Sequence, residues 1–135
     1  MAGALVSDNG MVVDSDVLIW FVQGNPKAIT VLEAAGDWHF CAVTCMELVQ
    51  GCRNETKLKA MQKAFKSGED DVLPVTQGIS DLARTPVKKY SPSHSVYLAD
   101  ALIAATSLQH VLPLLTTDKK HFSAIEELKV KAFRP

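Results

Sequence analysis

Short apolar runs alternate with longer segments of helical periodicity along this chain. Five runs rich in apolar and β-branched residues are typical of strands, and they cover residues 11–13, 38–43, 72–75, 112–117 and 130–133. Pro113 is expected near the beginning of its strand, since proline cannot donate a hydrogen bond within a sheet. The last run is expected at an edge of the sheet.

Helical patterns fill the intervals between these runs. Asn25-Pro26 favours the start of a helix and Gly36 its end. The expected helices cover about 26–35, 44–66 with a break near residue 51 or 54, a short stretch before Pro86, 96–110 behind a Ser95 cap, and a last turn at the capping box Ser123-x-x-Glu126. Strands that alternate with helices predict an α/β fold, with a mostly parallel sheet covered by helices on both faces.

Size and composition indicate one globular domain. The 135 residues are 47% hydrophobic and 21% charged, which excludes a disordered chain. Residues 1–10 lack a pattern, so we expect a leader or extension of no assigned function before a single domain over 11–135. No apolar run approaches the roughly 18 residues of a membrane span, and no signal peptide is apparent. The three cysteines, Cys41, Cys45 and Cys52, are expected to be reduced thiols, which favours a cytoplasmic protein.

Four acidic residues stand at positions that suggest a shared site. Asp14 follows the first predicted strand, Glu47 lies shortly after the second, and Asp118 follows the fourth. Asp100 is the lone charge in the apolar helical segment VYLADALIAA. Because ligands bind outside the carboxyl ends of parallel strands, we expect all four carboxylates at one edge of the sheet.

Clustered carboxylates need a cation. At a separation of about 4 Å and an effective dielectric near 20, two of them repel by roughly 4 kcal/mol. Oxygen ligands without nearby His or Cys favour Mg²⁺ or Mn²⁺ over zinc. The chemistry that suits such a site is metal-assisted attack of water on a phosphodiester.

Three of these acids also have structural explanations when each is taken singly. Thr44-x-x-Glu47 fits a helix capping box, Asp118 can cap the turn before the last helix, and Asp14 can form an Asx turn. Asp100 resists such an explanation, because a buried acid on an apolar helix is costly unless it is paired or metal-bound.

The segments around these acids resemble a known family. VVDSDVLIW, TCMELVQG, LADALIAATSLQH and LLTTDKKHF are similar to the four successive motifs of the PIN-domain ribonucleases, especially the VapC-type toxins of toxin-antitoxin pairs. The likeness runs from about Met11 to Phe133, and DALIAAT is its most specific part. The resemblance implies a three-layer α/β/α sandwich on a parallel five-stranded sheet.

The same resemblance implies roles for individual residues. It makes the metal-binding and catalytic set Asp14, Glu47, Asp100 and Asp118, with Thr116 as an auxiliary hydroxyl that orients water or substrate. Asp16 stands where the family frequently has Asn or Ser, so its membership in the metal shell is left open. The implied partners are an RNA substrate, a cognate antitoxin and a second copy of the chain.

The net charge of −1 creates no general field for polyanions, so any RNA contact must be local. One local candidate is a basic stripe formed by Arg53, Lys57, Lys59, Lys63 and Lys66. Its five positive charges stand against Glu55 alone, which gives a local charge of +4. Its interpretation is open between a solvated helix face and phosphate contacts. The candidate RNA-backbone residues are Arg53, Lys57, Lys59, Lys63, Lys119 and Lys120. His94 and His121 are assigned surface or capping roles, because neither falls among the matched acids.

The leading hypothesis is therefore a Mg²⁺- or Mn²⁺-dependent endoribonuclease that acts as a toxin. A haloacid dehalogenase-like phosphatase is an alternative, because Asp14-x-Asp16 after a hydrophobic strand resembles its nucleophile and acid pair. The later motifs of that family are not found in the required order. A second alternative is a non-catalytic PIN-like binding domain in which the acids serve as caps and surface charges.

Overall fold

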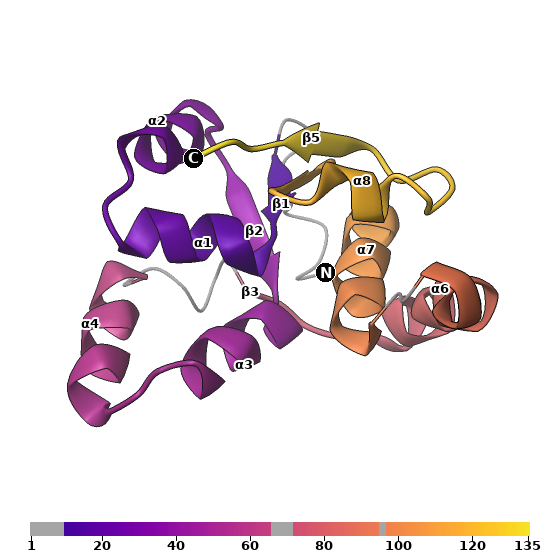
Figure 1. Cartoon of the computed structure of the whole chain (residues 1–135), viewed down its shortest axis with the longest axis horizontal. Coiled ribbons are helices and arrows are strands. Elements are labelled where there is room, and N and C mark those ends of the chain that lie inside the picture. Colours follow the sequence, from indigo (N-terminus) through magenta and orange to yellow (C-terminus); the bar gives the residue numbers. More distant parts are fainter. Residues whose placement is uncertain (1–9, 66–71, 95–96) are drawn as a thin grey trace.

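The computed structural model describes residues 10–65, 72–94 and 97–135 and contains a five-stranded parallel sheet (Figure 1). The strands are β1 (Met11–Val13), β2 (Trp38–Cys41), β3 (Val72–Leu73), β4 (Leu114–Thr116) and β5 (Val130–Ala132), in the order β3-β2-β1-β4-β5. Central Val12 is in register with His39 of β2 and Leu114 of β4. The predicted parallel sheet is confirmed, and β5 lies at its edge as expected.

Helices cover both faces of this sheet. They are α1 (Ser15–Val22), α2 (Pro26–Ala34), α3 (Ala42–Gln50), α4 (Glu55–Ala64), α6 (Gln77–His94), α7 (Leu98–His110) and α8 (Lys119–Phe122). Val13 and Phe40 face a core shared with Leu18 and Leu32 of α1 and α2, whereas Val12 faces a second core that contains Ile103 of α7. The alternation of side chains along each strand thus produces the predicted α/β/α sandwich.

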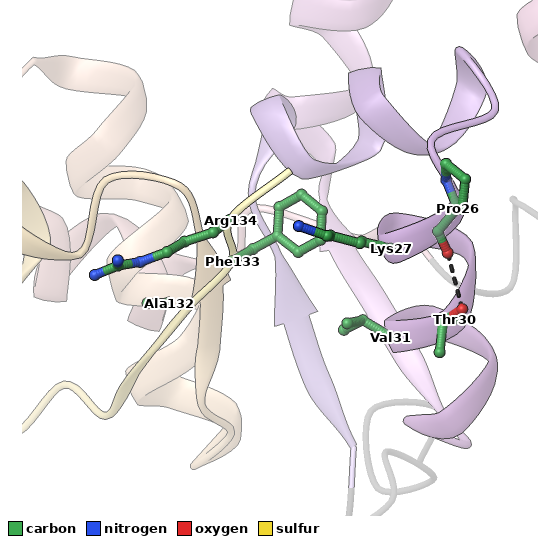
Figure 2. A pocket seen from close by; sticks show the side chains of 7 residues that line it. All are labelled: Pro26, Lys27, Thr30, Val31, Ala132, Phe133 and Arg134. Carbon is green, nitrogen blue, oxygen red and sulfur yellow. Dashed lines mark hydrogen bonds between the residues drawn. The ribbon is translucent and has the colours of Figure 1, made fainter.

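The chain beyond β5 returns to α2. Phe133 is buried in the same core as Leu32, and it lies opposite Val31 of α2 in Figure 2. Its backbone N–H donates to the carbonyl of Thr116 across 2.8 Å, which continues the β4 pairing one residue past β5. The last residues are therefore fixed beside the end of β4.

Several predicted boundaries differ from the structure. The second strand ends at Cys41, which caps α3, so Thr44 lies inside that helix and the Thr44-x-x-Glu47 capping box is wrong. The apolar residues Ala42 and Val43 look like a continuing strand in the sequence, but the cap has already turned the chain. The predicted break between α3 and α4 is confirmed, with Asn54 capping α4 through the backbone N–H of Lys57.

The helix expected to end before Pro86 instead continues to His94. Ile79 and Ala83 pack against α7, and Val87, one turn beyond Ala83 and directly after the buried Pro86, continues the same face. Packing along this stripe offsets the hydrogen bond that a proline removes from a helix. α6 therefore continues through Pro86.

The Ser123-x-x-Glu126 capping box is also wrong. Ser123 ends α8 instead of starting a helix, and its hydroxyl donates to the Lys119 carbonyl across 2.6 Å. At the start of α7, Tyr97 takes the cap position without a side-chain hydrogen bond. The predicted cap Ser95 lies outside the described residues, as do residues 1–9 of the predicted leader.

Two further expectations concern the membrane and the cysteines. Within the described ranges, no helix combines the length and apolar character needed to cross a bilayer. All three cysteines are free thiols, as predicted, and Cys41 is buried.

Candidate functional site

Asp14 lies at the carboxyl end of the central strand and begins α1. Its side chain is 7% exposed; Oδ1 accepts from the Ser15 backbone N–H at 2.8 Å and Oδ2 from the Thr116 hydroxyl at 2.7 Å. Burial raises the pKa of Asp14 to about 6, although both hydrogen bonds oppose the shift. The nearby charges of Asp16 and Asp100 make smaller upward contributions to the same shift. Asp14 caps a helix, and it is also a buried carboxylate close to other acids.

Asp100 stands in the first turn of α7, across the sheet edge from Asp14. Its Oδ2 lies 3.2 Å from Nε2 of His121, and both side chains are largely buried. Burial raises the pKa of Asp100, and contact with His121 opposes that shift. The charges of Glu47 and Asp118 raise it again, so acids from three elements act on one another here.

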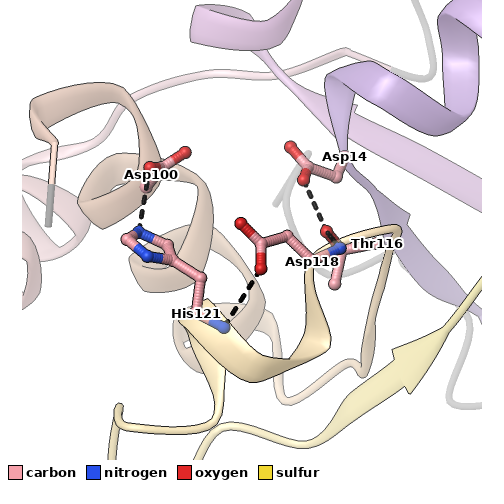
Figure 3. A network of polar contacts seen from close by, with 5 residues as sticks. All are labelled: Asp14, Asp100, Thr116, Asp118 and His121. Atoms are coloured by element: carbon pink, nitrogen blue, oxygen red, sulfur yellow. Dashed lines mark hydrogen bonds and ion pairs between the residues drawn. The ribbon is translucent and has the colours of Figure 1, made fainter.

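Asp118 follows β4 and caps the single turn of α8. Its Oδ1 accepts from the His121 backbone N–H at 3.2 Å, and its own N–H donates to the Thr116 hydroxyl oxygen at 3.1 Å. One threonine hydroxyl therefore contacts both Asp14 and the Asp118 backbone. Figure 3 shows the carboxylates of Asp14, Asp100 and Asp118 around a common space.

Glu47 projects from the middle of α3 and is exposed. Its Oε1 accepts from the Ser15 hydroxyl at 2.7 Å, which ties α3 to the start of α1. Thr44, its supposed capping partner, is buried, and its hydroxyl has no hydrogen-bond partner among the described residues. Glu47 is therefore held by Ser15 and not by a capping box.

The structure adds two residues that the sequence reasoning did not place in the site, Ser15 and His121. Only the spacing hinted at His121: three residues after Asp118 is where a capping aspartate meets a backbone N–H. Its contact with Asp100 depends on α7 and α8 lying together. Asp16, left open in the sequence, is exposed and accepts from the Thr117 hydroxyl at 3.2 Å.

These acids form an oxygen-rich site whose carboxylates stand too far apart to share an ion. Among the residues with described positions, no three Asp, Glu, His or Cys side chains approach closely enough to hold one. The donor set nevertheless fits a hard divalent cation, because its ligands are carboxylate oxygens, and burial, with a smaller contribution from mutual repulsion, already raises the pKa of Asp14 and Asp100. A bound cation would have to pull the carboxylates closer.

A groove of about 790 Å³ extends from this site between α1, α3 and α4. Asp16 and Glu47 line its end near the acids, and Arg53 and Lys57 line it farther along. Lys59 instead pairs with Glu55 at 3.5 Å in full solvent, while Lys63 is exposed and does not line the groove. The basic stripe is thus divided between a groove side and a solvated side; Lys66 lies outside the described residues.

Lys119 and Lys120 form the first turn of α8, directly after Asp118, and both are exposed. Their position beside the acids agrees with their choice as candidate phosphate contacts, which stays a prediction.

Comparisons with known proteins identify the family of this chain. The model of the PIN domain family matches residues 11–128. The chain belongs to the PIN domain family. A comparison with curated protein sequences gave no match.

Solved structures share the fold of this PIN domain. A toxin-antitoxin complex from Klebsiella pneumoniae gives a TM-score of 0.75 at 24% identity, with 90% of this chain and 96% of that chain covered. FitAcB from Neisseria gonorrhoeae gives 0.70 at 23%, covering 89% and 95%. DNA-bound VapBC from Salmonella typhimurium gives 0.77 at 15%, covering 91% and 97%. At these identities the likeness is one of fold.

Proposed function

We propose that this PIN domain is a VapC-type toxin, a nuclease that cleaves RNA phosphodiester bonds with Mg²⁺ or Mn²⁺. The observation that carries the proposal is the convergence of Asp14, Asp100 and Asp118 from separate elements on one space, inside a PIN domain (Figure 3). The toxin-antitoxin complexes among the structures of the same fold support the toxin assignment.

In this proposal the chain's own residues preorganise the ligands. The cation ligands are Asp14, Glu47, Asp100 and Asp118. In Glu47, Asp100 and Asp118 the contacts described above hold one carboxylate oxygen, which leaves the second for a cation. When bound, the cation supplies charge stabilisation at the phosphate and a more acidic water.

Three neutral or weakly basic groups keep these acids in place. Thr116 orients Asp14, Ser15 orients Glu47, and His121 contacts Asp100 with its ring and Asp118 with its backbone. Such support matters because a catalytic constellation must be held to within a fraction of an ångström.

A cognate antitoxin and a second copy of the chain complete the proposal. A basic antitoxin side chain placed among the acids is attracted by their charge and excludes a cation. Co-expression with the product of a small neighbouring gene tests the first partner by co-purification, and sizing at micromolar concentration tests the homodimer.

The activity itself is tested with purified protein, cellular RNA and a generic phosphomonoester in parallel. We expect RNA cleavage with Mg²⁺ or Mn²⁺ and none with EDTA, and no release of phosphate from the monoester. A covalent aspartyl phosphate on Asp14 would instead support the phosphatase alternative. Stabilisation by metal without any hydrolysis would support the non-catalytic binding domain.

A further inference from the structure

A second hollow, of about 370 Å³, lies between the start of α2 and the chain that follows β5 (Figure 2). Val31 and Phe133 give it an apolar floor, and Lys27 and Arg134 line it with cations. This hollow is separate from the groove described above, since the two share no lining residue.

The two cations are exposed and carry their charge into solvent. Neither Lys27 nor Arg134 forms an ion pair with any described residue. No acidic residue with a described position lines the hollow, so nothing in its described lining neutralises the charge of these two cations. An anionic ligand would gain from this local field even though the whole chain is weakly acidic.

The directions of the side chains favour a chain of anions over a single one. In Figure 2 the Lys27 side chain extends from α2 toward Phe133, whereas Arg134 points away on the other side. Diverging cations cannot close around one small anion, but they can contact separate phosphates of one strand. Pro26 has no N–H and the Ala28 N–H already donates to Asn25, so the start of α2 offers few free backbone donors beside the two cationic side chains.

This hollow is connected to the acidic site by one hydrogen bond. Phe133 N–H donates to the carbonyl of Thr116, the residue whose hydroxyl holds Asp14. Because β4 and β5 are parallel, Arg134 follows the carboxyl end of β5, at the same end of the sheet as the acids. Arg134 and the acids can therefore be contacted from one end of the sheet.

We infer that Lys27 and Arg134 form a second backbone-binding site, which holds phosphates of a single-stranded RNA away from the scissile bond. The inference rests on the proposed function for the identity of the polyanion. It assigns to RNA a surface that is distinct from the groove lined by Arg53 and Lys57. Phosphate contacts of this kind hold the strand without reading its sequence.

The test measures binding of a short labelled single-stranded RNA by fluorescence anisotropy in EDTA, across a range of salt concentrations. EDTA keeps the RNA intact if the protein is a metal-dependent nuclease. The variants are Lys27→Gln, Arg134→Gln and the pair together. Lys129→Gln is the matched control, because Lys129 lies at the other end of the sheet, just before β5. Its carbonyl accepts from the backbone N–H of Leu114, the first residue of β4.

We expect each single variant to weaken binding about fivefold near 0.1 M salt and to reduce the salt slope by about 0.7, because each single-strand phosphate contact contributes that slope. The double variant should lose about 1.4 of the slope, with the unfolding midpoint unchanged, and Lys129→Gln should match the wild type. Affinity and slope unchanged in the double variant would overturn the inference. So would equal losses in Lys129→Gln, or a loss of antitoxin binding with RNA binding intact.

A parallel cleavage assay with Mg²⁺ separates the two claims. Weakened RNA binding in the variants of a protein that cleaves no RNA overturns the proposed function and leaves the inference standing. RNA cleavage by the wild type, with RNA binding unaltered in the variants, supports the proposed function and overturns the inference.

Discussion

The hydroxyl of Thr116 donates to Asp14 across 2.7 Å, and both side chains are buried at the ends of adjacent central strands. The same hydroxyl oxygen accepts the backbone N–H of Asp118. One side chain of β4 thus fixes two of the candidate metal ligands.

Replacement of Thr116 by Val should expose how much this hydroxyl contributes. The pKa of Asp14 should rise above about 6, because the lost hydrogen bond lowers it. The free energy of unfolding at neutral pH should fall by about 1.5 to 3 kcal/mol, the usual contribution of a hydrogen bond to a charged group. Carboxyl NMR titration and urea unfolding measure the two effects. Thr116→Ser keeps the hydroxyl and should restore the pKa, and an unshifted pKa in Thr116→Val would contradict the role.

Asp14 should make metal-free stability depend on pH. Its pKa is about 6 in the folded protein against an ordinary value of 3.8, so the folded protein binds more protons between these values. Stability should therefore fall as pH rises from about 4 to about 6, by about 3 kcal/mol in total. Asp14→Asn should lack this fall and be more stable than the wild type at pH 7 without metal. Urea unfolding across this pH range, with exposed Asp81→Asn as control, checks the prediction; parallel curves for wild type and Asp14→Asn would refute it.

His121 should control Asp100. In His121→Ala the pKa of Asp100 should rise further, because contact with His121 lowers it. His121→Gln keeps a hydrogen-bond donor and should give a smaller rise. Carboxyl NMR titration reports both, with Asp14 as the internal reference. If Asp100 titrates alike in all three proteins, His121 has the surface role that its sequence position suggested.

Asp100→Asn should separate two effects of the acidic cluster, the loss of stability that it causes without metal and the binding of Mg²⁺. The substitution removes a charge that burial disfavours and relieves its repulsion from Glu47 and Asp118, so the metal-free variant should unfold at a higher temperature than the wild type. Mg²⁺ should raise the unfolding temperature of the wild type and not of the variant. A variant that is less stable without metal and still gains stability from Mg²⁺ would make Asp100 purely structural.

The residues of the basic stripe should differ in their contribution to RNA binding, according to whether they line the groove. Lys57 lines the groove near Glu47, whereas Lys59 is turned to solvent and paired with Glu55. Lys57→Gln should therefore reduce the salt slope of RNA binding by about 0.7 and Lys59→Gln should leave it unchanged. Equal effects of the two variants would make the whole stripe a solvated helix face.

The order of strands and helices could be predicted because the apolar runs of a parallel sheet are distinct from helical periodicity. The ends of the elements were harder to predict. Ala42 and Val43 prolong the apolar run of β2 in the sequence, but they already belong to α3, which Cys41 caps. The helix predicted to end before Pro86 continues past it, because the packing of α6 on α7 outweighs the local tendency of proline to end a helix.

The candidate acids could be chosen from the sequence because each follows a predicted strand or interrupts an apolar helix. Their supporting residues could not, because those contacts join distant segments. Ser15 is 32 residues from Glu47, and His121 reaches Asp100 only when α7 and α8 are packed against the same sheet. The hollow at Lys27 and Arg134 arises in the same way, from a chain end that returns to α2.

The central claim is that carboxylates at the end of the sheet hold the cation on which RNA cleavage depends. The most direct measurement is the initial rate of RNA cleavage as a function of Mn²⁺ concentration for the wild type, Asp118→Asn and the control Asp81→Asn. We expect saturable activation in the wild type and the control, and loss of cleavage at every Mn²⁺ concentration in Asp118→Asn. Cleavage that persists in EDTA, or an Asp118→Asn curve that overlays the wild type, would contradict the account.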